Sequence, residues 1–177
     1  SLVDDYREPC MKINLALIEA AGKIGVKTAV LHPSSEPITD EERPSRLATS
    51  RENILRTMEV CAKAGMTLAV ENLPRTCLCR TAGEMVSLLK GTGACAVFDT
   101  NHSLIQDNPA FLRELASEIR IASLHISDYD FVDERHRLPG DGVIGWKTIL
   151  AILEEHSYSG PLMYEVPKCP KEREPIP

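Results

Sequence analysis

The chain has 177 residues, of which 43% are hydrophobic and 26% are charged, and its formal net charge is −6 at pH 7. This length and composition are typical of one folded domain with a sizeable core, and they exclude a wholly disordered chain. The negative charge disfavours a protein that binds nucleic acid by neutralising phosphates. No run approaches the roughly 20 apolar residues of a membrane-spanning helix, and acidic residues occupy the start of the chain, where a signal peptide would be basic. We therefore expect a cytoplasmic protein without a membrane partner.

Short apolar runs alternate along the chain with amphipathic helical patterns. In chain order they predict helix 11–23, strand 28–31, helix 44–64, strand 66–72, helix 81–89, strand 95–102, a helix from 108, strand 120–128, helix 146–155 and strand 161–166. Thr81 followed by Glu84 is a capping box that begins the third helix, and Pro109 at a first helical position begins the fourth. The strands are continuously rather than alternately apolar, which is typical of a parallel sheet covered by helices.

No linker or change in composition divides these elements, so residues 1–166 are expected to form one α/β domain. The tail 167–177 is rich in proline and is expected to be extended or disordered. The six cysteines form no CxxC pair and several lie in apolar runs, which predicts reduced thiols in an intracellular protein. Cys77 and Cys79 are most simply two thiols in a loop, with a soft-metal or redox role as the alternative.

Each of the five predicted strands ends at residues that can bind a metal ion or move a proton. These residues are His32, Glu71, Asp99 with His102, His125 with Asp128, and Glu165. In a parallel sheet the carboxyl ends of the strands lie on one edge, so these side chains are expected to converge. Carboxylate and imidazole ligands suit Mn²⁺, Mg²⁺, Co²⁺ or Zn²⁺. A single His or carboxylate at the end of a strand is most simply a satisfied hydrogen-bonding group. Five strands that all end in this way predict a metal site, because buried charge is costly unless it is paired or metal-bound.

The polar loop over residues 134–142 contains Glu134, His136 and a turn with the sequence PGDG. Two interpretations stay open from the residues alone. The segment is either a solvated surface loop, or it returns over the site and brings Glu134 or His136 to it.

Six segments in order resemble the xylose-isomerase-like TIM barrels, a family that includes sugar phosphate isomerases and epimerases and the endonuclease IV group. The segments are VLHPS, LAVENLP, FDTNH, LHISDYD, RHRLPGDGVIGW and YSGPLMYEV, and they extend from His32 to Val166. The resemblance implies a TIM (β/α)8-type barrel, of which the chain would supply the C-terminal five βα units. The open sheet edge would then need a cover, for example a partner chain in a homo-oligomer.

The resemblance also implies roles for individual residues. The implied metal ligands are Glu71, Asp99, His125 and Glu165. Glu71 and Glu165 would also be the acid/base pair of the epimerase branch. His102 occupies a position that contacts substrate in epimerases and a second metal ion in the endonuclease branch.

Further substrate contacts are expected from His32, His136 and Arg135. His32 and His136, with Glu134, also match additional metal ligands of the endonuclease branch, although that branch has Asp at the position of Glu134. Sugar epimerases usually carry an Arg six residues after the His ligand. Phe131 stands there in this chain, so Arg135 or Arg137 would have to replace that Arg.

Three functions remain open at this point. The first is a divalent-metal-dependent isomerase or epimerase of a sugar, sugar phosphate or related polyol, in which Glu71 and Glu165 exchange a proton through an enediolate-type step and His102 holds substrate oxygens. The second is an endonuclease IV-like phosphodiester hydrolase with two or three metal ions. The third is a truncated, non-catalytic barrel. The acidic charge favours a small sugar-like partner, and metal stoichiometry discriminates the first function from the second.

Overall fold

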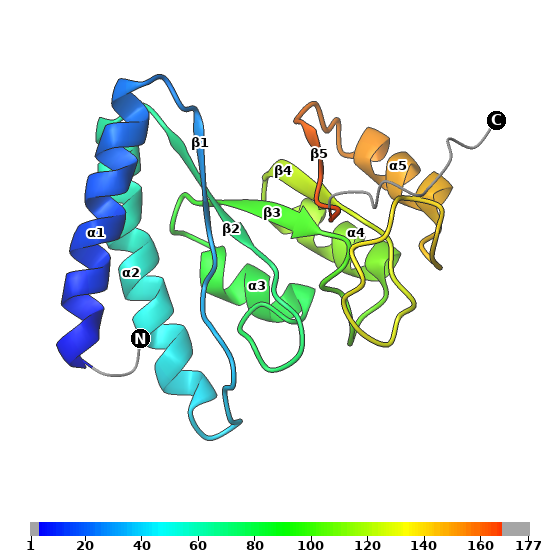
Figure 1. The fold of residues 1–177 in the computed structure, drawn as a ribbon, viewed down its shortest axis with the longest axis horizontal. Coiled ribbons are helices and arrows are strands. Elements are labelled where there is room, and N and C mark those ends of the chain that lie inside the picture. The colour runs from blue at the N-terminus through cyan, green and yellow to red at the C-terminus, as the bar shows by residue number, and fades with distance from the viewer. Residues whose placement is uncertain (1–3, 168–177) are drawn as a thin grey trace.

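The computed structural model describes residues 4–167, in which five parallel strands form one sheet in the order β1-β2-β3-β4-β5. The strands are β1 Thr28–Leu31, β2 Thr67–Glu71, β3 Cys95–Asp99, β4 Ile121–Ile126 and β5 Leu162–Tyr164. The helices are α1 Asp4–Lys23, α2 Arg43–Lys63, α3 Ala82–Leu89, α4 Asn108–Glu118 and α5 Trp146–Glu155. Figure 1 shows the strands connected through helices, with the βα units following one another from β1 on the left to β5 on the right. The predicted parallel sheet covered by helices is therefore confirmed.

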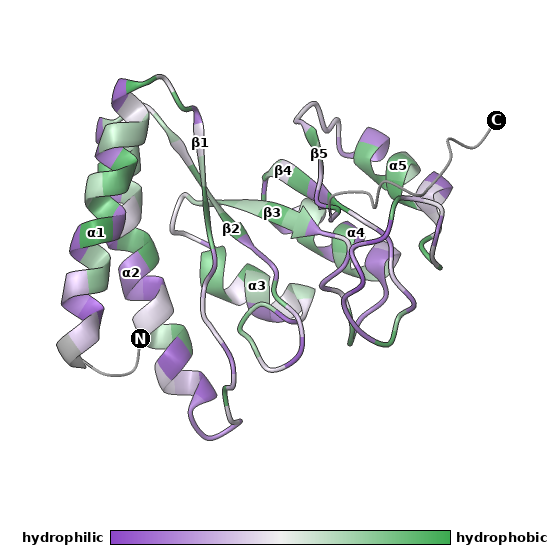
Figure 2. Ribbon diagram, viewed as in Figure 1, coloured by the Kyte–Doolittle hydropathy of each residue, from purple (hydrophilic) through white to green (hydrophobic). Residues whose placement is uncertain are grey.

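The two faces of the sheet bury different residues, because successive side chains of a strand point to opposite faces. In β3, Ala96 and Phe98 belong to the main core between the sheet and the helices, where the rings of Phe98 and Phe111 lie 5.4 Å apart. Cys95 and Val97 face the other side in a smaller cluster with Ala69. Figure 2 shows hydrophobic residues along α3 and β3, and hydrophilic residues in much of the loop that follows β4.

Five βα units with this connectivity make part of a TIM-type (β/α)8 barrel, as predicted. Within the described residues, β1 and β5 are each paired along one edge only. Met163 of β5 is 52% exposed on this side of the sheet, and Val30 of β1 is exposed there as well. The face of the sheet that would line a closed barrel is therefore accessible from both edges.

The observed elements differ from the predicted ones at the start of α1 and at the ends of β2 and β3. Helix α1 begins at Asp4 rather than at residue 11, because its polar first turns are held against α2, where Glu8 accepts a hydrogen bond of 2.6 Å from Arg56. Strands β2 and β3 end at Glu71 and Asp99, before the polar residues that follow them. These following residues use their backbone and side chains to build the site instead of extending the sheet.

Of the two hydrogen bonds of the predicted capping box at the start of α3, only the one accepted by the Thr81 side chain is confirmed. Thr81 Oγ1 accepts a hydrogen bond from Glu84 N at 3.4 Å. The Glu84 carboxylate instead accepts from Cys79 N at 2.7 Å and pairs with Arg43 Nε at 2.8 Å. The same glutamate therefore ties the preceding loop to α2.

The cysteines of the described part of the chain are free thiols, in agreement with the predicted absence of disulfides there. Burial raises the pKa of the Cys77 and Cys79 thiols. Among the described helices, none combines the length and apolarity that crossing a membrane requires. The predictions for the proline-rich tail fall almost entirely on residues 168–177, which lie outside the described residues.

Candidate metal centre

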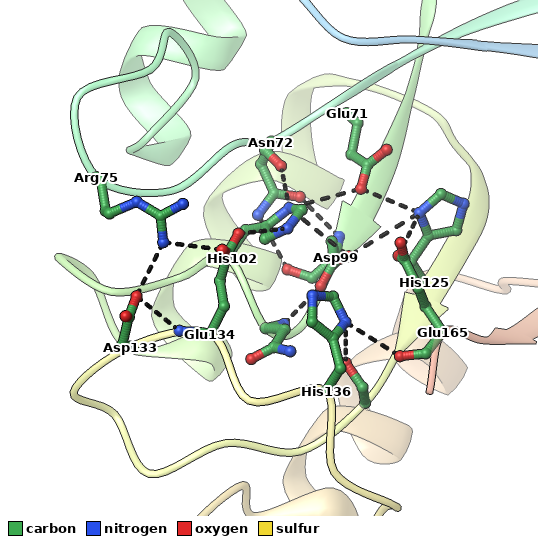
Figure 3. A network of polar contacts seen from close by, with 12 residues as sticks. Glu71, Asn72, Arg75, Asp99, His102, His125, Asp133, Glu134, His136 and Glu165 are labelled. Atoms are coloured by element: carbon green, nitrogen blue, oxygen red, sulfur yellow. Dashed lines mark hydrogen bonds and ion pairs between the residues drawn. The ribbon is translucent and has the colours of Figure 1, made fainter. Parts of the chain in front are cut away.

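Four of the predicted site residues form one cluster at the carboxyl edge of the sheet. We call Glu71, Asp99, His125 and Glu165 the carboxylate cluster; one ligand atom from each lies within 4.8 Å of all the others. They come from four neighbouring strands or the residue after one, because parallel pairing aligns the ends of β2, β3, β4 and β5. Figure 3 shows the four side chains directed toward a common point.

One imidazole nitrogen faces all three carboxylates of the cluster. His125 Nδ1 lies 3.0 Å from Glu71 Oε1, 3.2 Å from Glu165 Oε2 and 3.9 Å from Asp99 Oδ2. Glu71 and Asp99 are buried, whereas the side chain of Glu165 is 49% exposed. A surface cavity of about 570 Å³ lies on that exposed side and is lined by Glu165, His136 and Arg135. The cluster is therefore open to a small molecule beside Glu165.

The two buried carboxylates of the cluster, Asp99 and Glu71, have opposite pKa shifts. Burial, together with the neighbouring Glu71 and Glu165, raises the pKa of Asp99 well above its usual range. Burial acts in the same direction on Glu71, but hydrogen bonds from His125 and His32 outweigh it and lower the pKa of Glu71. The hydrogen bond to Glu71 in turn raises the pKa of His125 and of His32. Three carboxylates in one partly buried place thus call for compensating positive charge.

One oxygen atom of the cluster accepts no hydrogen bond, and it tests whether a metal ion fits. Asp99 Oδ2 is buried and accepts no hydrogen bond, while its Oδ1 accepts from Asn101 N at 2.6 Å. A buried carboxylate oxygen that accepts no hydrogen bond is costly in the absence of a cation. Three carboxylates and an imidazole are the donor set of Mn²⁺ or Zn²⁺ sites in proteins. The residues of the cluster therefore fit a divalent cation.

Two asparagines that sequence reasoning missed hold Asp99 in place. Asp99 N donates to Asn72 Oδ1 at 2.7 Å, and Asn72 Nδ2 donates back to Asp99 O at 3.0 Å. Asn101 N donates to the Asp99 carboxylate, and Asn101 Oδ1 accepts from Arg135 N at 3.1 Å. Asn72 directly follows Glu71, and Asn101 lies two residues after Asp99. This position beside a predicted ligand is the feature of the sequence that could have identified them. Such partners orient metal ligands in known sites.

A second group of ligand atoms lies beside the cluster. His102, Glu134 and His136 each offer one ligand atom within 4.8 Å of the others. His102 Nε2 lies 3.0 Å from Glu134 Oε1, and its Nδ1 lies 3.5 Å from Glu71 Oε1. Burial lowers the pKa of His102. His136 Nδ1 lies 3.1 Å from the backbone oxygen of Glu165. The loop that follows β4 thus returns to the site, which decides between the two interpretations of this segment.

Arg75 connects this loop to the rest of the site, and nothing in the sequence singled it out. Its Nη1 lies 2.8 Å from both Asp133 Oδ1 and Glu134 Oε2, and its Nε donates to Glu36 Oε1 at 2.9 Å. Figure 3 shows Arg75 reaching across to Glu134 from the segment after β2. Three loops that are distant in sequence are therefore joined by one guanidinium.

Asp128, which the sequence placed with His125 at a strand end, points into the loop and not into the carboxylate cluster. Its Oδ2 accepts from Gly140 N at 2.8 Å and from Trp146 Nε1 at 2.9 Å. Its Oδ1 accepts from Tyr129 N at 2.9 Å and from Ile144 N at 3.1 Å. This buried carboxylate joins the beginning of the loop to its end.

The remaining predicted residues lie at the periphery of the cluster. His32 Nε2 lies 3.2 Å from Glu71 Oε2, although its side chain is 62% exposed. The Arg135 guanidinium pairs with Asp130 Oδ2 at 2.7 Å, and the residue lines the surface cavity beside Glu165. Phe131 is exposed, and its ring packs edge-on against Tyr129. Arg137 also faces Asp130, with Nη2 at 3.7 Å from its Oδ2.

Comparisons with known proteins agree with this architecture. An inosose dehydratase of Salmonella typhimurium (strain LT2) is 29% identical over 117 residues, which cover 55% of this chain and 39% of that protein. The structure of a D-tagatose 3-epimerase-like protein superposes with a TM-score of 0.85 at 22% identity, over 94% of this chain and 65% of that one. The IolI protein with a zinc atom gives a TM-score of 0.77 at 19% identity, over 93% of this chain and 62% of that one.

The chain thus spans about two fifths of the curated relative that it matches and just under two thirds of each of these structures. The family model described as xylose isomerase-like TIM barrel matches residues 3–176, nearly the whole chain. Together with the five parallel βα units and the order of the strand-end residues, this match shows that the chain belongs to the xylose isomerase-like TIM barrel family.

Proposed function

We propose that the chain carries the site of a divalent-metal-dependent isomerase or epimerase that acts on a sugar or a related polyol. One observation carries the proposal: two carboxylates, those of Glu71 and Glu165, approach the same nitrogen of His125 from different strands, at 3.0 and 3.2 Å. Two carboxylates around one point can remove a proton from a carbon and return one from another direction. The similarity to a D-tagatose 3-epimerase-like structure supports the same class of reaction.

The two carboxylates have environments suited to different roles. Glu71 is buried and its pKa is lowered, so it is ionised near neutral pH and can accept a proton from the substrate carbon next to a carbonyl. Glu165 is half exposed beside the surface cavity, where it can return a proton and receive one from solvent. A divalent ion held by the carboxylate cluster would supply Lewis-acid polarisation of the carbonyl. His102, whose Nδ1 lies 3.5 Å from Glu71 Oε1, would hold a substrate oxygen.

Two alternative functions, a dehydratase and a phosphodiester hydrolase, are each favoured by one observation. The similarity to inosose dehydratase supports the same proton removal followed by loss of water instead of return of the proton. The group formed by His102, Glu134 and His136 could hold a further metal ion, which favours a phosphodiester hydrolase with more than one ion per site.

Proton exchange with solvent tests the proposal most directly. The chain is supplied with Mn²⁺, Co²⁺ or Zn²⁺ and incubated with a panel of ketoses and inososes in D₂O, and loss of the hydrogen next to the carbonyl is followed by NMR. We expect exchange that Glu71→Gln and Glu165→Gln abolish. Glu118→Gln, on the exposed surface of α4 where Glu118 pairs with Lys90, should leave exchange unchanged.

Metal content and products, measured in these samples and in a parallel sample that contains a phosphodiester, separate the alternatives. One ion per chain with an unchanged substrate mass supports an epimerase or isomerase, and loss of one water in the mass spectrum identifies a dehydratase. Two or three ions with hydrolysis of a phosphodiester would establish the hydrolase. Absence of solvent exchange across the panel, in a chain that retains one ion, would refute the proposed reaction.

A further inference from the structure

The group formed by His102, Glu134 and His136 has the donor atoms of a second metal site, but its charge environment differs from that of the carboxylate cluster. Within the described part of the chain, the three carboxylates of the cluster are paired with histidines, and neither an arginine nor a lysine forms an ion pair with them. Glu134 instead contacts a guanidinium, since Arg75 Nη1 lies 2.8 Å from its Oε2. The charge of the cluster therefore still calls for a cation, whereas the charge of Glu134 is already compensated.

The two oxygens of Glu134 are divided between two partners. Oε1 lies 3.0 Å from His102 Nε2, and Oε2 lies 2.8 Å from Arg75 Nη1. His102 Nδ1 lies 2.9 Å from the backbone oxygen of Asn72, which can only accept a hydrogen bond. In the neutral imidazole Nδ1 therefore carries the proton, and Nε2 is the nitrogen that is available to a metal ion. An ion bound between Nε2 and Oε1 would have to share the Glu134 carboxylate with the guanidinium.

Arg75 is also held in place by contacts other than Glu134. Its Nε donates to Glu36 Oε1 at 2.9 Å, in the loop after β1, and its Nη1 donates to Asp133 Oδ1 at 2.8 Å, in the loop after β4. Its backbone φ of 51° lies in the left-handed region, where a residue other than glycine persists only if its surroundings hold it. Figure 3 shows the guanidinium directed at Asp133 and Glu134. The positive charge is therefore fixed next to Glu134.

We propose that Arg75 competes with a second divalent ion for Glu134, so that the chain binds one ion, in the carboxylate cluster. A fixed positive charge in contact with a ligand repels a divalent ion, and repulsion at such short range lowers affinity by about tenfold or more even near a protein surface. Glu36 and Asp133 are more exposed than Glu134, so solvent screens their opposing charges more strongly. This role of Arg75 rests on the proposed function and deepens it. One ion suits proton exchange on a sugar-like substrate, whereas a hydrolase with several ions would need the second group.

Metal stoichiometry tests the role of Arg75 without any substrate. The full chain and its variants are titrated with Zn²⁺ in a calorimeter, and bound ions are counted by elemental analysis after dialysis. We expect one tightly bound ion per chain in the wild type. Arg75→Gln and Arg75→Met remove the charge and keep most of the side-chain length, so both should bind a second ion about tenfold or more tightly than the wild type does. Arg75→Lys keeps the charge and should restore a single ion.

Two controls locate the second ion. Arg80→Gln removes another guanidinium, whose Nη2 pairs with Asp40 Oδ1 at 3.4 Å, and this variant should bind one ion as the wild type does. Glu134→Gln, added to Arg75→Gln, removes the ligand for which the guanidinium competes. The double variant should lose the second ion and keep the first.

Two tightly bound ions in the wild type would overturn the proposal, and so would equal affinity for a second ion in the wild type and Arg75→Gln. A second ion that persists in the double variant with Glu134→Gln would overturn it too, because that ion would be bound elsewhere. These outcomes differ from failure of the proposed function, which is absence of solvent exchange in a chain that retains one ion.

Discussion

Replacement of Asp128 by asparagine is expected to destabilise the loop that carries Glu134 and His136. Asp128 is fully buried, and its two carboxylate oxygens each accept two hydrogen bonds from the loop and from Trp146. Asparagine has the same shape but only one acceptor oxygen; its other terminal group is an NH₂ donor. Whichever way the amide is turned, two of the four N–H donors then face an N–H group.

The size of the effect follows from these bonds. A hydrogen bond to a charged group contributes about 1.5–3 kcal/mol, so loss of two lowers the free energy of unfolding by about 3–6 kcal/mol. This is a large part of the roughly 5–15 kcal/mol that stabilises a typical domain. Because the bonds lie at both ends of the loop, the amides of Gly140 and Ile144 should also lose protection from hydrogen exchange.

Urea denaturation of the wild type and Asp128→Asn measures the loss, and hydrogen exchange locates it. Asp40→Asn is the control, because the Asp40 side chain is 84% exposed and its pair with Arg80 is a surface contact; surface pairs contribute little. A loss for Asp128→Asn no larger than that for Asp40→Asn would refute the assignment of Asp128 as the residue that holds the loop.

Two further predictions concern the same loop. Burial acts to raise the pKa of Asp128, but hydrogen bonds from Trp146 and from backbone amides outweigh it and lower this pKa. The stability that Asp128 contributes is therefore fully present above about pH 4, the ordinary pKa of an Asp in the unfolded chain. It is lost as the pH falls through the lower pKa that Asp128 has in the folded protein. The difference in unfolding free energy between the wild type and Asp128→Asn should accordingly shrink as the pH falls below about 4, and a constant difference would contradict the shift. Gly142→Ala should cost about 1–3 kcal/mol in thermal unfolding, because a Cβ there would overlap Asp128 Oδ1 and Tyr129 O. Gly145→Ala, whose Cβ would meet only Thr148 Oγ1 at 3.8 Å, is the control and should change little.

The sequence by itself determined the order of the βα units and the cluster at the sheet edge. Apolar runs and capping signals are local properties of the chain, and they placed every strand close to its observed position. The convergence of Glu71, Asp99 and His125 was predictable because adjacent parallel strands bring their carboxyl ends together. The order of the motifs, and not any single residue, identified the family.

Only the tertiary structure decided what lies beyond the strand ends. Asp128 follows His125 by three residues, outside β4, where the alternation of side chains no longer tells which way a residue points. Its carboxylate therefore joins the loop, although its place in the sequence resembles that of a ligand. Arg75 acquires its partners Glu36 and Asp133 from loops far away in the chain, and no local pattern encodes such contacts. Local propensity specifies the elements, whereas the partners of a loop side chain depend on the packing of the whole domain.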